Sequence, residues 1–225
     1  VIAANAVDAG LTDVAVIARQ DPYGEGLEKA FSKNFTDAGG TVTSELLYDP
    51  AAASFEAEVA EIKAGNPQAV VVIGFEETTK LMQEMIKQGV GPADVQIYLV
   101  DGNLSTAAYK DFPKGTMKGV LGTIPVGEQD LTDFNASLKE IDPSLEDFTY
   151  GAQAYDAMML IALAAEAAGC GDVAAIAAKV PEVANTGGEK CTTFADCLAL
   201  LQAGTKIDFD GVTGPLDFNQ YGDPK

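Results

Sequence analysis

The sequence predicts an α/β protein with a doubly wound parallel sheet, followed by a mostly helical segment. Over the first half of the chain, short apolar runs rich in Val and Ile alternate with stretches of helical period. The run Ala69–Gly74 has no polar face, which is typical of a strand that helices cover on both sides. Beyond Pro125 and Gly127 the alternation stops and helical patterns dominate, which suggests a change of construction there.

Residues 1–125 are expected to form a Rossmann-like lobe. Strands that alternate with helices of this length are joined by right-handed crossovers, which give a parallel sheet with helices on both faces. Gly39 and Gly40 end one predicted helix, and Ser54 is expected to cap the next. The expected strands are 14–18, 41–48, 69–74, 96–100 and 119–126, and the expected helices are 1–8, 25–38, 54–64, 77–89 and 104–109.

Residues 126–225 are expected to form a mostly helical segment that ends in a hairpin. Ala-rich stretches of helical period replace the strands of the first half. In the tail, residues 206–225, apolar and polar residues alternate around glycines, as in a hairpin. The expected helices are 130–141, 147–168, 173–180 and 194–202.

The composition excludes several classes of function. The formal net charge is −20, from 34 acidic and 14 basic residues spread along the chain, so we expect neither nucleic acid nor an anionic membrane as a partner. Histidine is absent, which removes Ser-His and Cys-His catalysis and ligation of metals by His. We therefore expect no enzyme activity, no cofactor and no metal.

The sequence contains no segment expected to insert into a membrane. No apolar run approaches the roughly 18 residues that a membrane-spanning helix needs. The chain begins directly in helix-like sequence, without the charged segment and cleavage site of a signal peptide. We accordingly expect a mature or truncated chain.

Two of the three cysteines have a spacing that a short turn can close. Cys191 and Cys197 are separated by five residues, whereas Cys170 stands alone after a predicted helix. A Cys191–Cys197 disulfide would place the protein in an oxidising, extracytoplasmic compartment. Metal binding is the alternative, although no third and fourth ligand follow at a suitable spacing.

A candidate site follows from the ends of the predicted strands. The carboxyl ends of parallel strands meet at one edge of a sheet, and ligands bind in the crevice beyond that edge. Carboxylates beside aromatic rings suit a ligand with an ammonium group. Acid–base catalysis, Mg²⁺ ligation and plain solvated loop carboxylates are the alternatives. The residues at this edge are expected to be Asp21 and Tyr23, then Phe75, Glu76 and Glu77, then Asp101 and Asn103.

Six short motifs, in order along essentially the whole chain, resemble one known family. The sequence is similar to the type I extracytoplasmic solute-binding proteins, and within them to the branched-chain amino acid receptors of ABC transporters. The motifs are Asp21-Pro-Tyr-Gly-Glu-Gly26, Gly39-Gly40, Ala69-Val-Val-Val-Ile-Gly74, Tyr98-Leu-Val-Asp-Gly102, Tyr155-Asp-Ala and Gly211-Val-Thr-Gly-Pro-Leu-Asp-Phe218.

The resemblance implies two α/β lobes joined by three crossovers, with the ligand in the cleft between them. Compared with the family, this chain is expected to lack the first part of the N-terminal lobe and the last crossover. Residues 1–125 then resemble the C-terminal lobe, and residues 126–225 resemble a return segment that packs on the other lobe. The apolar face of the helix at 147–168 would lose part of its cover, so we expect self-association of the chain.

The resemblance also implies roles for individual residues. It assigns Tyr23 to the aromatic side chain that lies over the ligand, and Phe75 or Glu76 to the loop after the third strand. Asp101 resembles the acidic residue that holds the α-amino group, although the family more often has Glu in that role. Tyr150 resembles an aromatic residue that the other lobe contributes to the cleft.

The function that the resemblance implies is transport. The protein would be a periplasmic or lipid-anchored cell-surface receptor that binds a branched-chain amino acid, an amide or another small polar metabolite. It would deliver this ligand to the permease subunits of an ABC transporter. The alternative is the ligand-binding sensor domain of a transmembrane receptor, because one fold serves both functions.

Overall fold

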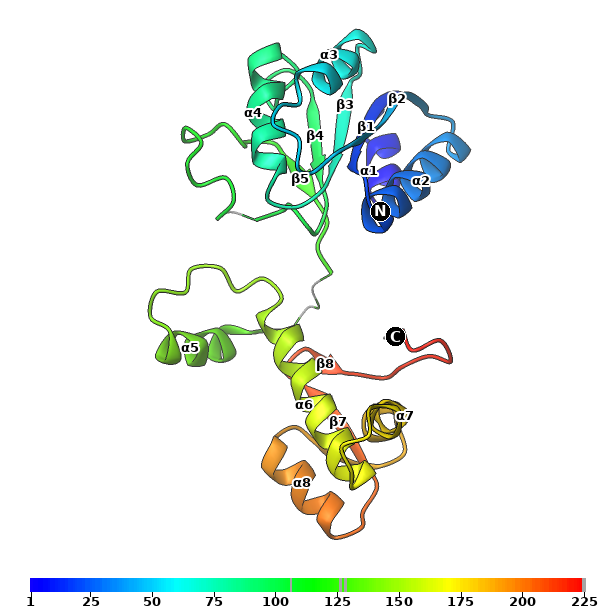
Figure 1. The fold of residues 1–225 in the computed structure, drawn as a ribbon, viewed down its shortest axis with the longest axis vertical. Coiled ribbons are helices and arrows are strands. Elements are labelled where there is room, and N and C mark those ends of the chain that lie inside the picture. The colour runs from blue at the N-terminus through cyan, green and yellow to red at the C-terminus, as the bar shows by residue number, and fades with distance from the viewer. Residues whose placement is uncertain (106, 126, 128, 224–225) are drawn as a thin grey trace. The chain divides into compact units, whose positions relative to one another are not determined.

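The chain forms two compact units, residues 1–125 (unit 1) and residues 126–225 (unit 2) (Figure 1). The structure is a computed structural model, and it describes residues 1–105, 107–125, 127 and 129–223. Each unit has its own sheet and its own apolar core.

The sheet of unit 1 is parallel throughout the described residues and has the strand order β2-β1-β3-β4-β5. This confirms the predicted doubly wound α/β class. The central strands β1 and β3 are buried along almost their whole length, because helices cover both faces of the sheet. The strands are β1 (Asp13–Arg19), β2 (Thr41–Tyr48), β3 (Ala69–Ile73), β4 (Gln96–Leu99) and β5 (Leu121–Gly122).

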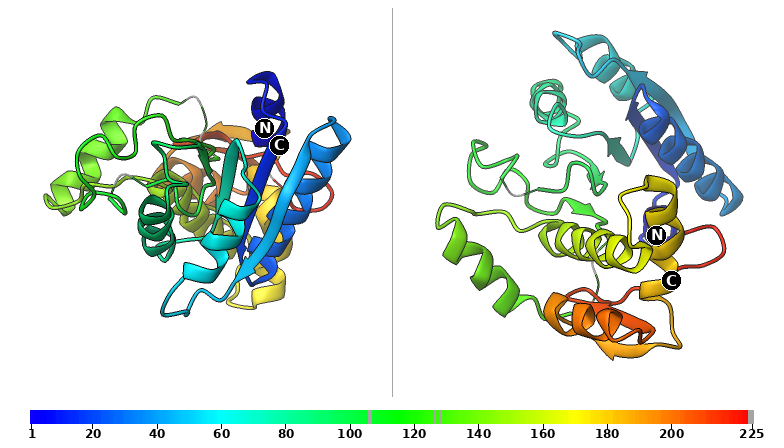
Figure 2. Two further views of the ribbon diagram at one scale, coloured as in Figure 1. Left: turned by 90° about the horizontal axis from the view of Figure 1, so that it is seen from above. Right: turned by 60° about the horizontal axis from the view of Figure 1, so that its bottom comes forward.

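The helices of unit 1 lie in two layers. Alternate residues of a strand point to opposite faces, so Ala15 and Ile17 of β1 pack toward α3 and α4, whereas Val14 and Val16 pack toward α1 and α2. The views in Figures 1 and 2 show α2 running alongside β1 and β2. The helices are α1 (Ile2–Asp8), α2 (Pro22–Asp37), α3 (Glu56–Ala64) and α4 (Thr78–Gln88).

Unit 2 is built from helices packed on a small sheet with the order β6-β7-β8. Strands β6 and β7 are parallel, and β7 and β8 form the predicted hairpin in the tail. The core is formed by α6, α7, α8 and β7, with Leu163, Cys197 and Phe209 among its most buried side chains. The elements are α5 (Thr132–Ile141), α6 (Gly151–Ala168), α7 (Val173–Ala184), β6 (Glu189–Cys191), α8 (Phe194–Gln202), β7 (Ile207–Gly211) and β8 (Gly214–Pro215).

A buried carboxylate joins α6 to the β7–β8 turn. Asp156 is 2% exposed and accepts hydrogen bonds from the backbone N–H groups of Val212 and Thr213, both at 2.9 Å, and from the Thr213 hydroxyl at 2.6 Å. A Cβ atom at Gly211 would lie 2.3 Å from the carboxylate of Asp156. The Tyr155-Asp-Ala motif and the glycine-containing tail motif therefore contact each other directly.

The predicted disulfide is present. Cys191 at the end of β6 is bonded to Cys197 in α8, with 5.3 Å between the Cα atoms, and both cysteines are buried. Cys170 has a free thiol and is exposed. Thr193 between the two bonded cysteines caps α8, because its hydroxyl accepts a hydrogen bond from the N–H of Asp196 at 3.2 Å.

Several predicted elements were wrong in detail. The helix expected over 104–109 is replaced by turns in the residues described there, and Thr106 lies outside them. The strand expected over 119–126 is limited to Leu121–Gly122, which pair with the last two residues of β4, and residue 126 is not described. The long helix begins at Gly151 instead of residue 147. Strand β6 was not predicted, and Phe55 occupies the N-cap position that we expected for Ser54.

No single helix in the described part of the chain has both the length and the apolar character needed to cross a membrane. Helices α6 and α7 meet the criterion only as a pair, and their axes are bent by 109° at the break between them.

Candidate functional site

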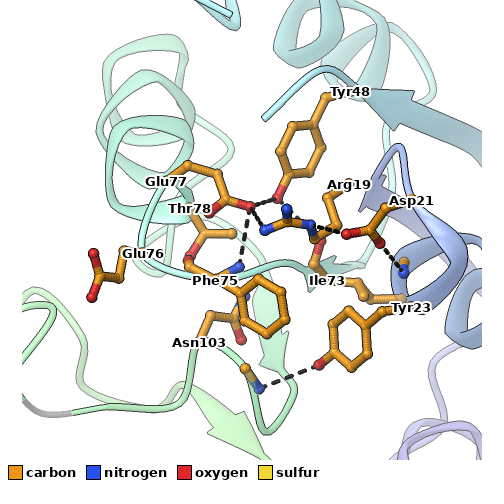
Figure 3. Close-up of polar contacts among 12 residues, drawn as sticks. Arg19, Asp21, Tyr23, Tyr48, Ile73, Phe75, Glu76, Glu77, Thr78 and Asn103 are labelled. Atoms are coloured by element: carbon orange, nitrogen blue, oxygen red, sulfur yellow. Dashed lines mark hydrogen bonds and ion pairs between the residues drawn. The ribbon is translucent and has the colours of Figure 1, made fainter. Parts of the chain in front are cut away.

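The candidate site lies at the carboxyl edge of the unit 1 sheet. The chain runs from β1 outward to β2 and then returns to β3 on the other side of β1, so the winding direction changes between β1 and β3. Ligands of open α/β sheets bind at such a point. Three segments meet there: residues 19–23 at the end of β1, residues 74–77 after β3 and residues 101–103 after β4 (Figure 3).

The turn after β1 places Tyr23 in the first turn of α2. Asp21 is the N-cap of this helix, and its carboxylate accepts a hydrogen bond from the N–H of Gly24 at 2.8 Å. Pro22 occupies the first helical position, where a missing N–H has no cost. The bond from Gly24, with help from the guanidinium of Arg19, holds the pKa of Asp21 below its usual value. Asp21 is therefore ionised at neutral pH and committed to the turn.

Tyr23, Phe75 and Asp101 come together as predicted from the strand ends. The rings of Tyr23 and Phe75 are stacked, with 4.9 Å between their centroids and 15° between their planes. The hydroxyl of Tyr23 donates to Oδ1 of Asp101 at 2.8 Å and accepts from the N–H of Gly102 at 3.3 Å. Residues from three separate strand ends thus form a single group, in which an aromatic pair lies beside a carboxylate.

Glu76 and Asn103 do not share this environment. Glu76 is exposed, and Figure 3 shows its carboxylate pointing away from Arg19 and Tyr23. Asn103 is 2% exposed; its carbonyl accepts from the N–H of Val100 and its amide donates to the carbonyl of Val72, each at 2.9 Å. Our placement of Asn103 at the open edge was therefore wrong, because its side chain satisfies the backbone where β4 ends. The role of Glu76 stays a prediction.

Tyr150, the predicted aromatic residue from the second half, belongs to unit 2. It is the N-cap of α6 and has φ 63° and ψ 2°, the left-handed region that a non-glycine residue seldom adopts. Its contribution to a ligand site stays a prediction.

Sequence reasoning missed Arg19, which ends β1 at the centre of the site. Its Nε lies 2.5 Å from Oδ2 of Asp21, and its Nη1 lies 3.0 Å from Oε1 of Glu77. Its guanidinium carbon lies 4.5 Å from the centroid of the Phe75 ring. The signal was available, since Arg19 is the only arginine in the sequence and directly follows the apolar run Val14–Ala18.

Glu77 also has a different role from the one expected at an open edge. Its Oε1 accepts from Arg19, from the hydroxyl of Tyr48 at 2.9 Å and from the N–H of Phe75 at 3.2 Å. Burial and the nearby Glu77 carboxylate raise the pKa of Tyr48 well above its usual value, so its hydroxyl stays protonated and donates. A Cβ atom at Gly74 would lie 1.9 Å from that hydroxyl, so only glycine allows this approach.

The charges at this edge favour a cationic ligand group. Asp21 and Glu77 are both paired with Arg19, and Asp101 is the carboxylate that the Tyr23 hydroxyl contacts beside the stacked rings. A recess of about 520 Å³ reaches Asp101 from the side of the sheet that α1 and α2 cover; most of its lining is apolar, and neither Tyr23 nor Phe75 lines it. A carboxylate beside aromatic faces suits a small ligand that carries an ammonium group.

Comparisons with known proteins give consistent similarities. A family model described as the receptor family ligand binding region matches residues 3–225. The sequence is 27% identical, over 218 residues, to Leu/Ile/Val-binding protein homolog 1 of Brucella suis. The aligned region covers 94% of this chain and 50% of that protein.

Two solved structures share the fold. A leucine binding protein from Thermotoga maritima aligns with a TM-score of 0.72 and 21% identity over 99% of this chain and 58% of that one. A branched-chain amino acid transporter substrate binding protein from Streptococcus pneumoniae, solved with isoleucine, aligns with a TM-score of 0.68 and 18% identity over 97% of this chain and 56% of that one. The chain thus spans little more than half the length of these relatives.

Proposed function

We propose that this chain is the substrate-binding part of an ABC transporter, because it belongs to the family described as the receptor family ligand binding region and is a type I periplasmic binding protein. The proposed ligand is a small amino acid of the branched-chain type, and the proposed partners are the membrane permease subunits. The names of the Brucella and S. pneumoniae proteins support this ligand class by similarity. We propose no catalytic role.

The observation that carries the ligand class is the contact of Tyr23 with both Phe75 and Asp101. In the proposed complex, Asp101 pairs with the ammonium group of the ligand, and the Tyr23 and Phe75 rings lie beside it. Glu76 and Tyr150 are proposed as further ligand contacts at the rim.

The proposed location is extracytoplasmic, either periplasmic or on the cell surface as a lipoprotein. The Cys191–Cys197 disulfide supports this, because such bonds persist in oxidising compartments and are rare in the cytosol.

A sensor domain is the second candidate. It is favoured by the description of the matching family model, which is that of a receptor family. A sensor and a transport receptor would use the same ligand-binding edge, so the two differ in the partner that recognises the ligand-bound protein.

Calorimetry with a matched pair of compounds tests the proposed ligand class. Leucine and 4-methyl-2-oxopentanoate have the same side chain and carboxylate, but only leucine has an ammonium group. We expect binding of leucine and at least tenfold weaker binding of the oxo acid, because Asp101 would lose its partner and repel the remaining carboxylate. Equal affinities, or no binding of leucine, would refute the ammonium site.

A further inference from the structure

We propose that the ion pair of Arg19 and Glu77 is a positioning device, which holds the Phe75 ring against Tyr23 and removes the positive charge of Arg19 from the ligand edge. The inference rests on the proposed function for its effect on ligand affinity, whereas its effect on the rings is independent of any ligand. Neither Arg19 nor Glu77 is proposed to touch the ligand.

Glu77 fixes the backbone of the loop that carries Phe75. One carboxylate oxygen, Oε1, accepts from the N–H of Phe75, from Tyr48 of β2 and from Arg19 of β1. The Glu77 side chain is only 15% exposed, and hydrogen bonds to a charged group are stronger when water is excluded. Oε1 of Glu77 therefore links the loop after β3 to both β1 and β2.

Arg19 fixes the ring itself. Its guanidinium lies over the ring of Phe75 at 4.5 Å, within the range of a cation–π contact. Asp21 and Glu77 hold the guanidinium at two of its nitrogens, so its plane cannot rotate freely. Phe75 is 39% exposed and would otherwise be free to change rotamer. Figure 3 shows Arg19 between these two carboxylates and close to the ring.

The same arrangement couples the two halves of the aromatic pair. Asp21 binds Arg19 and also caps the helix that carries Tyr23. Arg19 contacts Phe75, and Phe75 stacks on Tyr23. A Cβ atom at Gly102 would lie 2.6 Å from the Phe75 ring, so the ring also fits closely against the turn that carries Asp101. Loss of the ion pair should therefore also shift the side chains of Tyr23 and Asp101.

The ion pair also explains how an arginine can lie at an edge that binds an ammonium group. An unpaired guanidinium would repel the ligand cation. Two carboxylates on one guanidinium leave a net charge of about −1 for the three groups, which attracts a cation. Neutralising Glu77 would raise this net charge to about zero. It would therefore weaken the attraction for the ligand cation as well as the positioning of the Phe75 ring.

The test uses Glu77→Gln, with Glu84→Gln as a matched control. Glu84 has the same 15% exposure, lies in the adjoining helix α4 and is also ion-paired, with Lys87 at 3.1 Å, but it is not in contact with the aromatic pair. The measurement is the NMR shift of the Phe75 and Tyr23 ring protons in the ligand-free chain. We expect Glu77→Gln to move them toward the values of unstacked rings, and Glu84→Gln to leave them unchanged.

Arg19→Lys separates the two functions of the pair. Lysine keeps the positive charge for Glu77 but has no planar group to stack on Phe75. We expect ring shifts between those of the native chain and of Glu77→Gln, at similar melting temperatures. Native ring shifts in both variants would overturn the proposal.

Leucine affinity then links the pair to binding. We expect Glu77→Gln to weaken it by about tenfold and Glu84→Gln by less than twofold. Displaced rings with unchanged leucine affinity would overturn the link to the ligand. If the native chain binds no leucine, the proposed function fails, while the ring shifts still decide whether the pair positions Phe75.

Discussion

The central strands β1 and β3 of unit 1 are buried on both faces, whereas unit 2 covers its smaller described sheet with helices and adds specific bonds. In unit 1 the stabilising contacts are spread over two apolar layers, so no single side chain dominates. In unit 2 the chain is fastened by Asp156 and by the Cys191–Cys197 disulfide. A broad core leaves the strand ends of unit 1 available for function, while unit 2 depends on a few local interactions.

The largest effect is expected in unit 2, from Asp156→Ala. The variant leaves the N–H groups of Val212 and Thr213 without their acceptor in a partly buried turn, at a cost of about 3 kcal/mol. Hydrogen exchange should accelerate in α6 and β7 but not in the unit 1 sheet. Asp172→Ala, which removes an exposed helix cap, is the control and should cost about 1 kcal/mol. Equal costs would show that Asp156 has no special importance.

Removal of the disulfide comes next. The bond closes a short loop between β6 and α8, and the loss of this constraint should lower the stability of unit 2 by about 2 kcal/mol. Urea unfolding of Cys191→Ser/Cys197→Ser measures the change. Cys170→Ser should behave like the native chain, because that thiol is exposed and unpaired. Unchanged stability of the double variant would contradict the idea that unit 2 depends on a few local interactions.

A conservative deletion in unit 1 should be milder. Ile17 is fully buried at the centre of β1, and Ile17→Val removes one methyl group from a core that has many other contacts. We expect a loss of about 1 kcal/mol in the free energy of unfolding, with the cooperativity of unit 1 retained. A loss as large as that of Asp156→Ala would mean that unit 1 is no more tolerant than unit 2.

The smallest effect is a pH dependence at the candidate site. The folded pKa of Asp21 is lowered, so its stabilising contribution is complete above the unfolded value of about 3.9 and is lost as the pH falls through the lower, folded value. The stability difference between the native chain and Asp21→Asn should therefore be constant from pH 7 to about 5 and shrink below about 4. A difference that does not change with pH would show that the charge of Asp21 is not used.

Periodicity predicted most of the fold, and the errors have local causes. The central strands β1 and β3 are apolar runs, and the pattern alone predicts their burial. Strand β6 is three residues long and begins with Glu189 and Lys190, so only its pairing with β7 makes it a strand. The expected helix at 104–109 does not form in the residues described there, where Tyr109 packs into the core.

The site was predicted only in part, for a related reason. The positions of the predicted strand ends indicated that Tyr23, Phe75 and Asp101 lie together, because the sheet topology decides which strand ends meet. The bonds between side chains did not follow from topology. Whether Glu77 faces the ligand or the loop depends on its rotamer and on the approach of Tyr48 and Arg19.

The most direct test of the account is the leucine affinity of Asp101→Asn. Asparagine keeps an oxygen for the Tyr23 hydroxyl and removes only the charge that is proposed to hold the ammonium group. We predict a loss of about 2–3 kcal/mol by calorimetry, or roughly 30- to 150-fold in Kd, and no change for the exposed control Asp111→Asn. Native affinity in Asp101→Asn would contradict the central claim that this edge of unit 1 binds the ligand cation.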